Sequence, residues 1–338
     1  MAEVYKNFNA AEDVITGDIQ VVSAPLWSEN INPLSTTAGT GIGWYTSSAQ
    51  SASSAAYYID VYHRDPGTST NAAVQFSIAY GNINGSGSVG DPNTIGQNVN
   101  DTPTRAIYGQ YRNLLLPPTD TRFSFNGTEP DDIVVINIAR SRYRQKIDPG
   151  NWTLRLDTNF SITDDSGASD NYEIGAAGRI FNVRSGSAGE LDTSDTTVYG
   201  LFYPDAGIIV LNAPAIDSPK TTWVRHLAVS SQYSNAILLY DVIKTQDYFA
   251  ARSEEKVNST HYFVRVTNKQ FNYSNNPTYV TGSLGQFLHP TMQNNPSVYI
   301  TTVGMYDNLN RLVAVAKLSQ PLLKSFNREV LIKVKLDY

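Results

Sequence analysis

The chain has 338 residues, of which 41% are hydrophobic and 17% are charged, with a formal net charge of −6 and no cysteine. This length predicts two domains or one large β unit, and either can bury a core without disulfides or metal. The lack of cysteine excludes thiol catalysis and cysteine-held zinc, and a mildly acidic chain without clustered Lys and Arg argues against binding nucleic acid.

Residues 1–55 have the composition of an N-terminal arm or linker. A strand is expected at residues 18–24, and the segment after Pro25 is loop-like, with further Pro and Gly. Residues 47–56 are almost entirely Ser, Ala and Gln, which offer little to bury. Two interpretations stay open, since the arm can bridge to a neighbouring subunit or fold back onto its own chain. Its candidate contact residues are Trp27, Trp44 and Tyr45.

Residues 56–235 are predicted to form a β-rich central domain with long loops. Residues 132–140 carry a run of apolar side chains without alternation, which indicates a strand covered on both faces. Residues 152–160 alternate cleanly between apolar and polar, and residues 105–116 are expected to form a short helix. The other strands are expected at residues 57–63, 73–80, 180–183, 197–202 and 207–211.

Residues 236–338 are predicted to form a C-terminal α+β domain. Apolar residues at roughly helical intervals predict a helix within residues 236–252, and a strand is expected at residues 261–267. Residues 298–306 and 311–318 form the clearest hairpin pattern of the sequence. The predicted fold class is therefore mainly β with minor α, with antiparallel, sandwich-like sheets, long loops and an extended N-terminal arm.

The last predicted strand, residues 329–338, runs to the final residue of the chain. It places Val330, Ile332, Val334, Leu336 and Tyr338 on one face and Lys333, Lys335 and Asp337 on the other. Chain ends fray unless something holds them, so we expect this strand to pair within its own sheet or with a neighbour's sheet. The candidate contact residues at this end are Val334, Leu336 and Tyr338.

No pattern in the sequence predicts catalysis, a cofactor or a metal site. The four histidines do not form a His-Glu-X-X-His motif, and the Gly-rich segments do not end in Gly-Lys-Ser/Thr. Neighbouring carboxylates such as Asp131 and Asp132 point to opposite faces of a strand, unlike the facing pair of a glycosidase. Residues 1–6 lack the pattern of a signal peptide, and no apolar run approaches the ~20 residues that span a bilayer.

Several segments resemble a known family. Residues 262–268 (YFVRVTN), 298–307 (VYITTVGMYD), 312–319 (LVAVAKLS) and 331–338 (LIKVKLDY) are similar to virion structural proteins of large contractile-tailed, T-even-like phages. Residues 111–116, 148–152 and 200–205 look like the same group. The resemblance implies a component of the tail or baseplate, and it supplies no catalytic motif.

We therefore expect a non-enzymatic structural subunit of a virion, assembled in the host cytoplasm, without membrane insertion. Its expected partners are other tail or baseplate subunits and further copies of itself, joined through arms and the edges of β-strands. A tail-fibre or receptor-binding component and a head or neck protein are the alternatives. A tail-associated glycosidase is a further hypothesis, which rests only on the scattered carboxylates.

Overall fold

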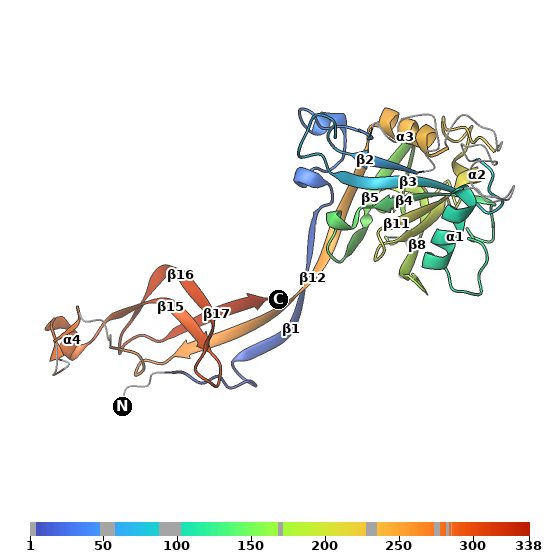
Figure 1. The fold of residues 1–338 in the computed structure, drawn as a ribbon. Coiled ribbons are helices and arrows are strands. Elements are labelled where there is room, and N and C mark those ends of the chain that lie inside the picture. Colours follow the sequence, from blue (N-terminus) through green and yellow to red (C-terminus); the bar gives the residue numbers. More distant parts are fainter. Residues whose placement is uncertain are drawn as a thin grey trace. The chain divides into compact units, whose positions relative to one another are not determined.

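The computed structural model describes residues 5–47, 58–87, 103–167, 172–227, 235–273, 278–281, 284 and 286–338. The chain forms two compact units (Figure 1). The larger unit is Val21–Glu255, and the smaller unit combines Met1–Gln20 with Lys256–Tyr338. The two strands β1 (Val14–Pro25) and β12 (Phe249–Val266) each have residues in both units. These boundaries differ from those expected from composition, because the smaller unit takes residues from both ends of the chain.

The larger unit is built on one antiparallel sheet, in the order β2-β3-β4-β11-β10-β8-β6-β5-β12. The prediction of a mainly β fold with antiparallel sheets is confirmed. The strands are β2 (Tyr58–Tyr62), β3 (Val74–Asn82), β4 (Asp132–Ile138), β5 (Lys146–Asp157), β6 (Phe160–Asp164), β8 (Gly178–Ser187), β10 (Gly200–Tyr203) and β11 (Ile208–Asn212), with the short β7 (Glu173–Gly175) and β9 (Glu190–Leu191) paired to β8.

The strand β4 lies between β3 and β11 and is buried on both faces, as its unbroken apolar run predicts. Val134, Ile136 and Ile138 belong to one core cluster, whereas Ile133 and Val135 belong to another. Successive side chains of a strand point to opposite faces, so the two clusters lie on opposite sides of the sheet. β4 pairs with β3 and β11, which leaves it no open edge.

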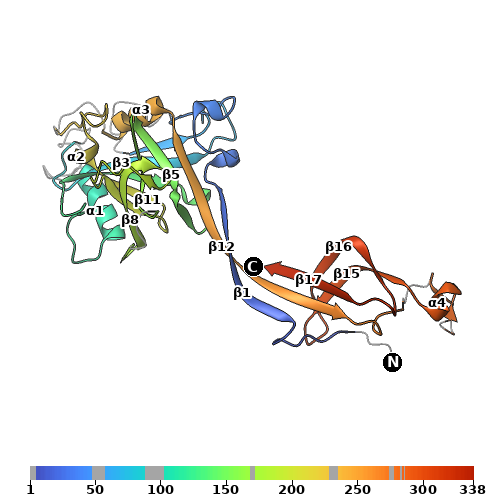
Figure 2. The ribbon, with the colours of Figure 1, turned by 180° about the vertical axis from the view of Figure 1, so that it is seen from behind.

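A helix covers each face of the sheet near β3 (Figures 1 and 2). α1 (Pro103–Leu115) places Ile107, Tyr108 and Leu115 in the cluster that contains Ile133. α3 (Asn235–Gln246) places Leu239, Ile243 and neighbouring residues in the cluster that contains Val134. α2 (Ala213–Ile216) and the 3-10 helices Ser28–Asn30, Thr36–Ala38 and Arg140–Arg142 complete the helical elements described in this unit.

Residues 26–47, which composition assigns to an extended arm, pack into the core of the larger unit. Leu26, Trp27, Leu34 and Trp44 are each at most 3% exposed and belong to the same cluster as Phe249. Large apolar side chains, widely spaced along this irregular segment, hold it against the sheet. Their burial removes apolar surface from water, and a flexible, solvated arm would leave that surface exposed. Residues 48–55 of the predicted arm lie outside the described residues.

The predicted helix within residues 236–252 is shorter than expected. α3 ends at Gln246, Asp247 takes a positive φ of 49°, and β12 begins at Phe249. The apolar residues at the end of the predicted helix are strand residues, since Phe249 and Ala251 are buried on one face of β12. Over so short a segment, the period of 2 residues of a strand and the period of 3.6 residues of a helix give similar apolar patterns. The pattern alone could therefore not distinguish a strand from a helix here.

The smaller unit contains the three-stranded sheet β1-β12-β17, with β17 (Val330–Asp337) paired antiparallel to β12 from Ser259↔Asp337 to Val266↔Val330. The predicted hairpin is present as β15 (Val298–Tyr306) and β16 (Leu312–Lys324). Met305 from the hairpin and Val330, Ile332 and Val334 from β17 form a core cluster between these two layers. The remaining elements are β13 (Val280–Thr281), β14 (Gln286–Phe287) and α4 (Thr291–Asn294).

Phe249→Ala is expected to destabilise the larger unit by about 3–5 kcal/mol, because it leaves a cavity in a closed core. The Phe249 ring is fully buried, with its centroid 4.8 Å from that of Trp27 and 5.3 Å from that of Phe76. Chemical denaturation followed by tryptophan fluorescence measures the change. Leu114→Ala, at an exposed position of α1, is the matched control and should stay within about 0.5 kcal/mol. Equal effects of the two substitutions would contradict the assignment of this core.

Candidate functional site

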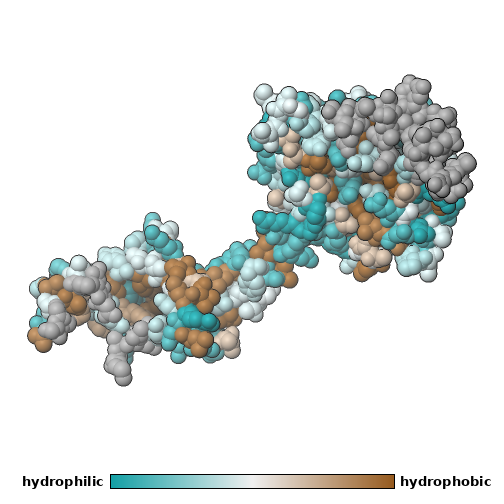
Figure 3. Space-filling model, viewed as in Figure 1, coloured by the Kyte–Doolittle hydropathy of each residue, from teal (hydrophilic) through white to brown (hydrophobic). Residues whose placement is uncertain are grey.

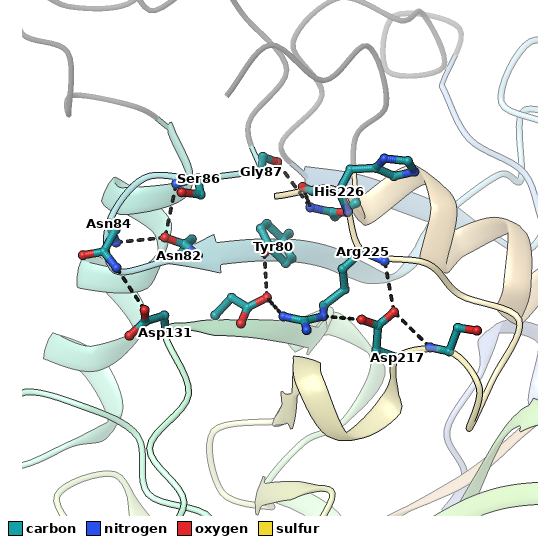
Figure 4. Close-up of polar contacts among 12 residues, drawn as sticks. Tyr80, Asn82, Asn84, Ser86, Gly87, Asp131, Asp217, Arg225 and His226 are labelled. Carbon is teal, nitrogen blue, oxygen red and sulfur yellow. Dashed lines mark hydrogen bonds and ion pairs between the residues drawn. The ribbon is translucent and has the colours of Figure 1, made fainter. Parts of the chain in front are cut away.

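A buried polar cluster of the larger unit joins β3, the start of β4 and the segment after α2 (Figure 4). The Tyr80 hydroxyl and Arg225 Nη1 both donate to Oδ2 of Asp132, each at 2.7 Å. The Arg225 Nε donates to Oδ2 of Asp217 at 2.7 Å, and the backbone nitrogens of Arg225 and Ser218 donate to its Oδ1. Asp132 is only 3% exposed, so a carboxylate here requires these partners.

The electrostatics of this cluster favour a fixed ion-pair network. Burial raises the pKa of Tyr80 well above its usual value, and the Asp132 carboxylate adds to this shift. Burial opposes the charge on Arg225, but the hydrogen bonds to Asp132 and Asp217 outweigh it and raise the pKa of the guanidinium. Tyr80 therefore stays a donor and Arg225 stays charged, so neither is suited to exchanging protons with a substrate near neutral pH.

The neighbouring polar contacts in Figure 4 hold the loop after β3. The Asn82 side-chain oxygen accepts hydrogen bonds from the backbone nitrogens of Asn84 and Ser86, at 2.9 and 3.1 Å. At the start of α3, the Asn235 side chain accepts from His226 N at 2.8 Å and donates to His226 O at 3.0 Å. These are loop-fixing contacts between main chain and side chain, a role in which Asn is common.

A surface depression of about 340 Å³ lies beside this network. Its lining residues are Thr222, Trp223, Val224, His226, Leu238, Asp241, Val242 and Thr245. Asp241 is the one carboxylate among them, and burial raises its pKa while Lys244 opposes the shift. A hydrolase of the carboxylate type needs two such groups facing each other, so this lining does not supply the acid–base pair.

The described residues contain no group of three or more His, Asp and Glu side chains placed to hold a metal ion. Likewise, no helix within the described ranges combines the length and the hydropathy needed to cross a bilayer. Two histidines show how internal partners hold these side chains. His63 lies 3.1 Å from the Gln75 side-chain nitrogen, and His261 lies 3.0 Å from the Asp18 carboxylate.

Lys324 is a buried amine in the smaller unit, at the end of β16. Its Nζ donates to the backbone oxygens of Asn268 and Ser325 and to the Asn272 side-chain oxygen, at distances of 2.8–3.1 Å. Burial lowers the pKa of this amine. An ammonium has three donors, and all three are used here. Lys324 therefore anchors the loop after β12 to the hairpin, and no donor is left for a ligand.

The predicted contact residues Trp27 and Trp44 lie inside the larger unit and are not available to a neighbouring subunit. The Trp27 Nε1 donates to the backbone oxygen of Phe249, and the Trp44 Nε1 donates to Asp247, both at 2.7 Å. The aromatic side chains fold back onto their own chain, which was one of the two interpretations left open by the sequence. Tyr45 is half-buried and pairs through its backbone with Tyr62.

At the other end of the chain, the structure separates the three predicted contact residues. Val334 is 5% exposed and belongs to the core of the smaller unit, so it is not a surface contact. Leu336 is half-buried against that core, whereas Tyr338 is 73% exposed. The alternation of the sequence put these side chains on one face, but it did not indicate that the hairpin covers most of that face.

The surface that the sequence did not identify is the outer face of the hairpin β15–β16. Tyr306, Leu312, Val313 and Val315 are each 48–68% exposed, and we name these four residues the hairpin patch. Gly304 lies beside Tyr306 and Leu312 of this patch. A Cβ atom at position 304 would lie 3.0 Å from the Tyr306 ring and 3.3 Å from the Leu312 side chain, so glycine leaves room for both. Apolar side chains also gather on the visible face of the smaller unit in Figure 3.

Two outer strands are a second feature of the smaller unit. In the sheet β1-β12-β17, β12 is paired on both sides, whereas β1 and β17 each have one pairing partner among the described residues. An unpaired edge presents a row of backbone donors and acceptors that can bind another strand. β1 is also exposed along most of its length, with Ile15 at 53% and Ile19 at 58%.

Comparison with known proteins gives no relative. No family model matches the chain, and neither a curated protein nor a solved structure matches it.

Asp247→Asn is expected to destabilise the larger unit by about 1–3 kcal/mol at neutral pH, since the amide keeps one acceptor oxygen but loses the charge and puts an NH2 donor opposite other donors. Burial alone would raise the pKa of Asp247, but hydrogen bonds from Thr36, Trp44 and Ser35 outweigh it and lower the pKa below the ordinary 3.8. The ionised carboxylate thus adds stability that is present above that value and is lost as the pH falls through the lower folded pKa.

Urea unfolding as a function of pH measures this effect. The difference between wild type and Asp247→Asn should narrow as the pH falls below 3.8. Asp120→Asn is the control, because Asp120 is exposed and, among the described residues, its side chain accepts from the neighbouring Thr119 hydroxyl alone. A difference between wild type and Asp247→Asn that does not change with pH would contradict the carboxylate's role.

Proposed function

We propose that this chain is a non-enzymatic structural subunit of a phage virion, placed in the tail or baseplate, which joins neighbouring subunits through its smaller unit. The observation that carries the proposal is the distribution of exposed apolar side chains. Most of the large apolar side chains that are exposed within the described ranges belong to the smaller unit, although it contains fewer residues than the larger one. Contiguous exposed apolar surface of this kind marks an interaction site.

The small core of this unit supports the same proposal. Its buried cluster consists of Met305, Val330, Ile332 and Val334. The hairpin patch has four apolar side chains on the outer face of β15–β16, as many as this buried cluster contains. A unit with so modest a core gains stability when a partner covers its outer surface, as permanent interfaces do.

The polar clusters support a role without catalysis. Asp132, Asp217 and Arg225 satisfy one another, and Asp247 is held by three donors from Ser35 and Thr36 and by Trp44 Nε1. Active sites usually leave an acid, a base or a nucleophile free to meet a substrate. These carboxylates instead fix loops to the sheet.

The proposed place in a particle rests on the family resemblance of the sequence. Residues 298–307, 312–319 and 331–338 carry that resemblance most densely, and all of them lie in the smaller unit. The segments that carry the resemblance most densely therefore include those that form the hairpin patch and the outer strand β17.

Replacing Val313 and Val315 together by Lys is expected to lower incorporation of the chain into purified particles about tenfold or more, because two charges would be buried in an apolar contact. Both side chains are exposed, so the unfolding midpoint of the purified variant should not change. Quantitative mass spectrometry of particles measures incorporation when the variant replaces the wild-type gene product.

Leu114→Lys is the control, since Leu114 is also more than half exposed but lies on α1 of the larger unit. It should be incorporated at the wild-type level. Absence of the wild-type chain from purified particles would refute the proposed function. Normal incorporation of the double variant would instead show that the hairpin patch is not the contact surface.

A further inference from the structure

The two outer strands of the smaller unit differ in charge, and this difference suggests how they are used. We propose that copies of this chain join head to tail, with the β17 edge of one copy pairing with the β1 edge of the next, so that the sheet β1-β12-β17 continues across copies. This inference rests on the proposed structural role and identifies one of its partners as a second copy of the chain.

The free backbone groups of β17 follow from its register. Asn258 and Tyr338 exchange both backbone hydrogen bonds, with N–O distances of 3.2 and 3.0 Å. In an antiparallel pair, such hydrogen-bonded positions alternate with positions whose N–H and C=O point away from the partner. Residues 330, 332, 334 and 336 therefore bond to β12, whereas Leu331, Lys333, Lys335 and Asp337 point their backbone groups outward. Within the described ranges, no strand pairs with these outward groups.

The β1 edge is open in the same way. The Asp13 backbone oxygen accepts from Phe263 N at 2.8 Å, and further along β1 the Asp18 carboxylate contacts His261. Residue numbers rise along β1 as those of the contacting residues in β12 fall, so the two strands are antiparallel. Counting from Asp13, the backbone groups of Val14 and Thr16 point away from β12. No strand among the described residues lies on that side of β1.

The two edges carry opposite charges. Glu12, Asp13 and Asp18 lie on or next to the β1 edge, whereas on the β17 edge Lys333 and Lys335 outnumber the one carboxylate, Asp337. The Lys333 amine has no anionic partner in the described part of the chain and lies 5.9 Å from the centre of the Phe263 ring. Lys335 is 2.9 Å from Asp337 and 2.6 Å from the Gln20 side chain. An acidic edge and a basic edge attract each other when one copy meets the next.

These charges also select the head-to-tail arrangement over a two-fold one. If β17 paired with β17 of a second copy about the middle of the strand, lysines would lie opposite lysines. Like charges directly opposite each other destabilise a strand pair, and the same holds for two acidic β1 edges. Pairing β17 with β1 uses two different surfaces, so it can continue from copy to copy and close into a ring.

The geometry of the sheet is compatible with such a join. β1 and β17 are each antiparallel to β12, so they run parallel to each other, and the contact between copies is a parallel pair. Parallel pairs are slightly less stable per residue than antiparallel ones. Assembly should therefore be reversible in dilute solution and become stable at the high local concentration of a particle.

The test uses two proline variants of the full chain, each of which blocks one edge. Lys333→Pro removes an outward N–H of β17, and Thr16→Pro removes an outward N–H of β1, so neither loses a hydrogen bond to β12. Sedimentation velocity measures the assembly state, and circular dichroism checks that each variant folds. Wild type should form species that grow with concentration, and each variant alone should be monomeric.

Mixing the two variants is the decisive step. Lys333→Pro keeps a working β1 edge and Thr16→Pro keeps a working β17 edge, so an equimolar mixture should form dimers and nothing larger. Self-association of Thr16→Pro alone would indicate β17–β17 pairing and overturn the proposal, and self-association of Lys333→Pro alone would indicate β1–β1 pairing and do the same. A mixture that remains monomeric would also overturn it.

Lys333→Glu provides a second variant that leaves the backbone unchanged. Reversing this charge should weaken association about two- to fivefold, the range of a cross-strand charge pair. If wild type is monomeric at every concentration, the head-to-tail inference fails. The proposed structural role fails separately, through absence of the chain from purified particles, so the two outcomes can be distinguished.

Discussion

The exclusion of water from both faces of β4 is the constraint on which the larger unit depends. Ile133 and Val135 face the cluster under α1, while Val134 and Ile136 face the cluster under α3. A strand buried on both faces needs two covering layers, and no single helix can provide both. The helices and the irregular residues 26–47 are therefore required by the sheet, and the polar clusters around Asp132 and Asp247 fix these covers in place.

In the smaller unit, by contrast, the hairpin is covered on one face only. Its hairpin and its three-stranded sheet cover each other on one face only, and the opposite face of the hairpin presents Tyr306, Val313 and Val315 to solvent. Its two outer strands also lack partners within the described ranges. Apolar surface and unpaired backbone in one small unit are both costs to a monomer, and both disappear in an assembly.

The sequence predicted those elements whose pattern is local. The unbroken apolar run of β4, the hairpin β15–β16 and the pairing of the terminal strand with a sheet could all be read from short segments. The burial of Trp27 and Trp44 could not, because the groups that hold them, Phe249 and Asp247, lie about two hundred residues away in the chain. Composition describes a segment by itself, whereas burial depends on what the segment meets.

The contact surface was partly predictable for the same reason. Alternation identified a strand ending in Tyr338 and suggested an edge, but residues 312–316 are apolar on both faces, so the outward face could not be chosen before the packing against β17 was known. The opposite charges of β1 and β17 are visible in the sequence as well. Their relation becomes meaningful only once both strands are seen to flank β12.

The division of the chain has a consequence for the order of events during synthesis. The larger unit is continuous from Val21 to Glu255, so it can fold as soon as those residues have left the ribosome. The smaller unit needs Val330–Asp337 to complete its sheet and its core, and these residues are translated after the whole of the larger unit. The smaller unit therefore completes its fold after the larger one, so its exposed hairpin and its outer strands come together only when the larger unit can already be folded.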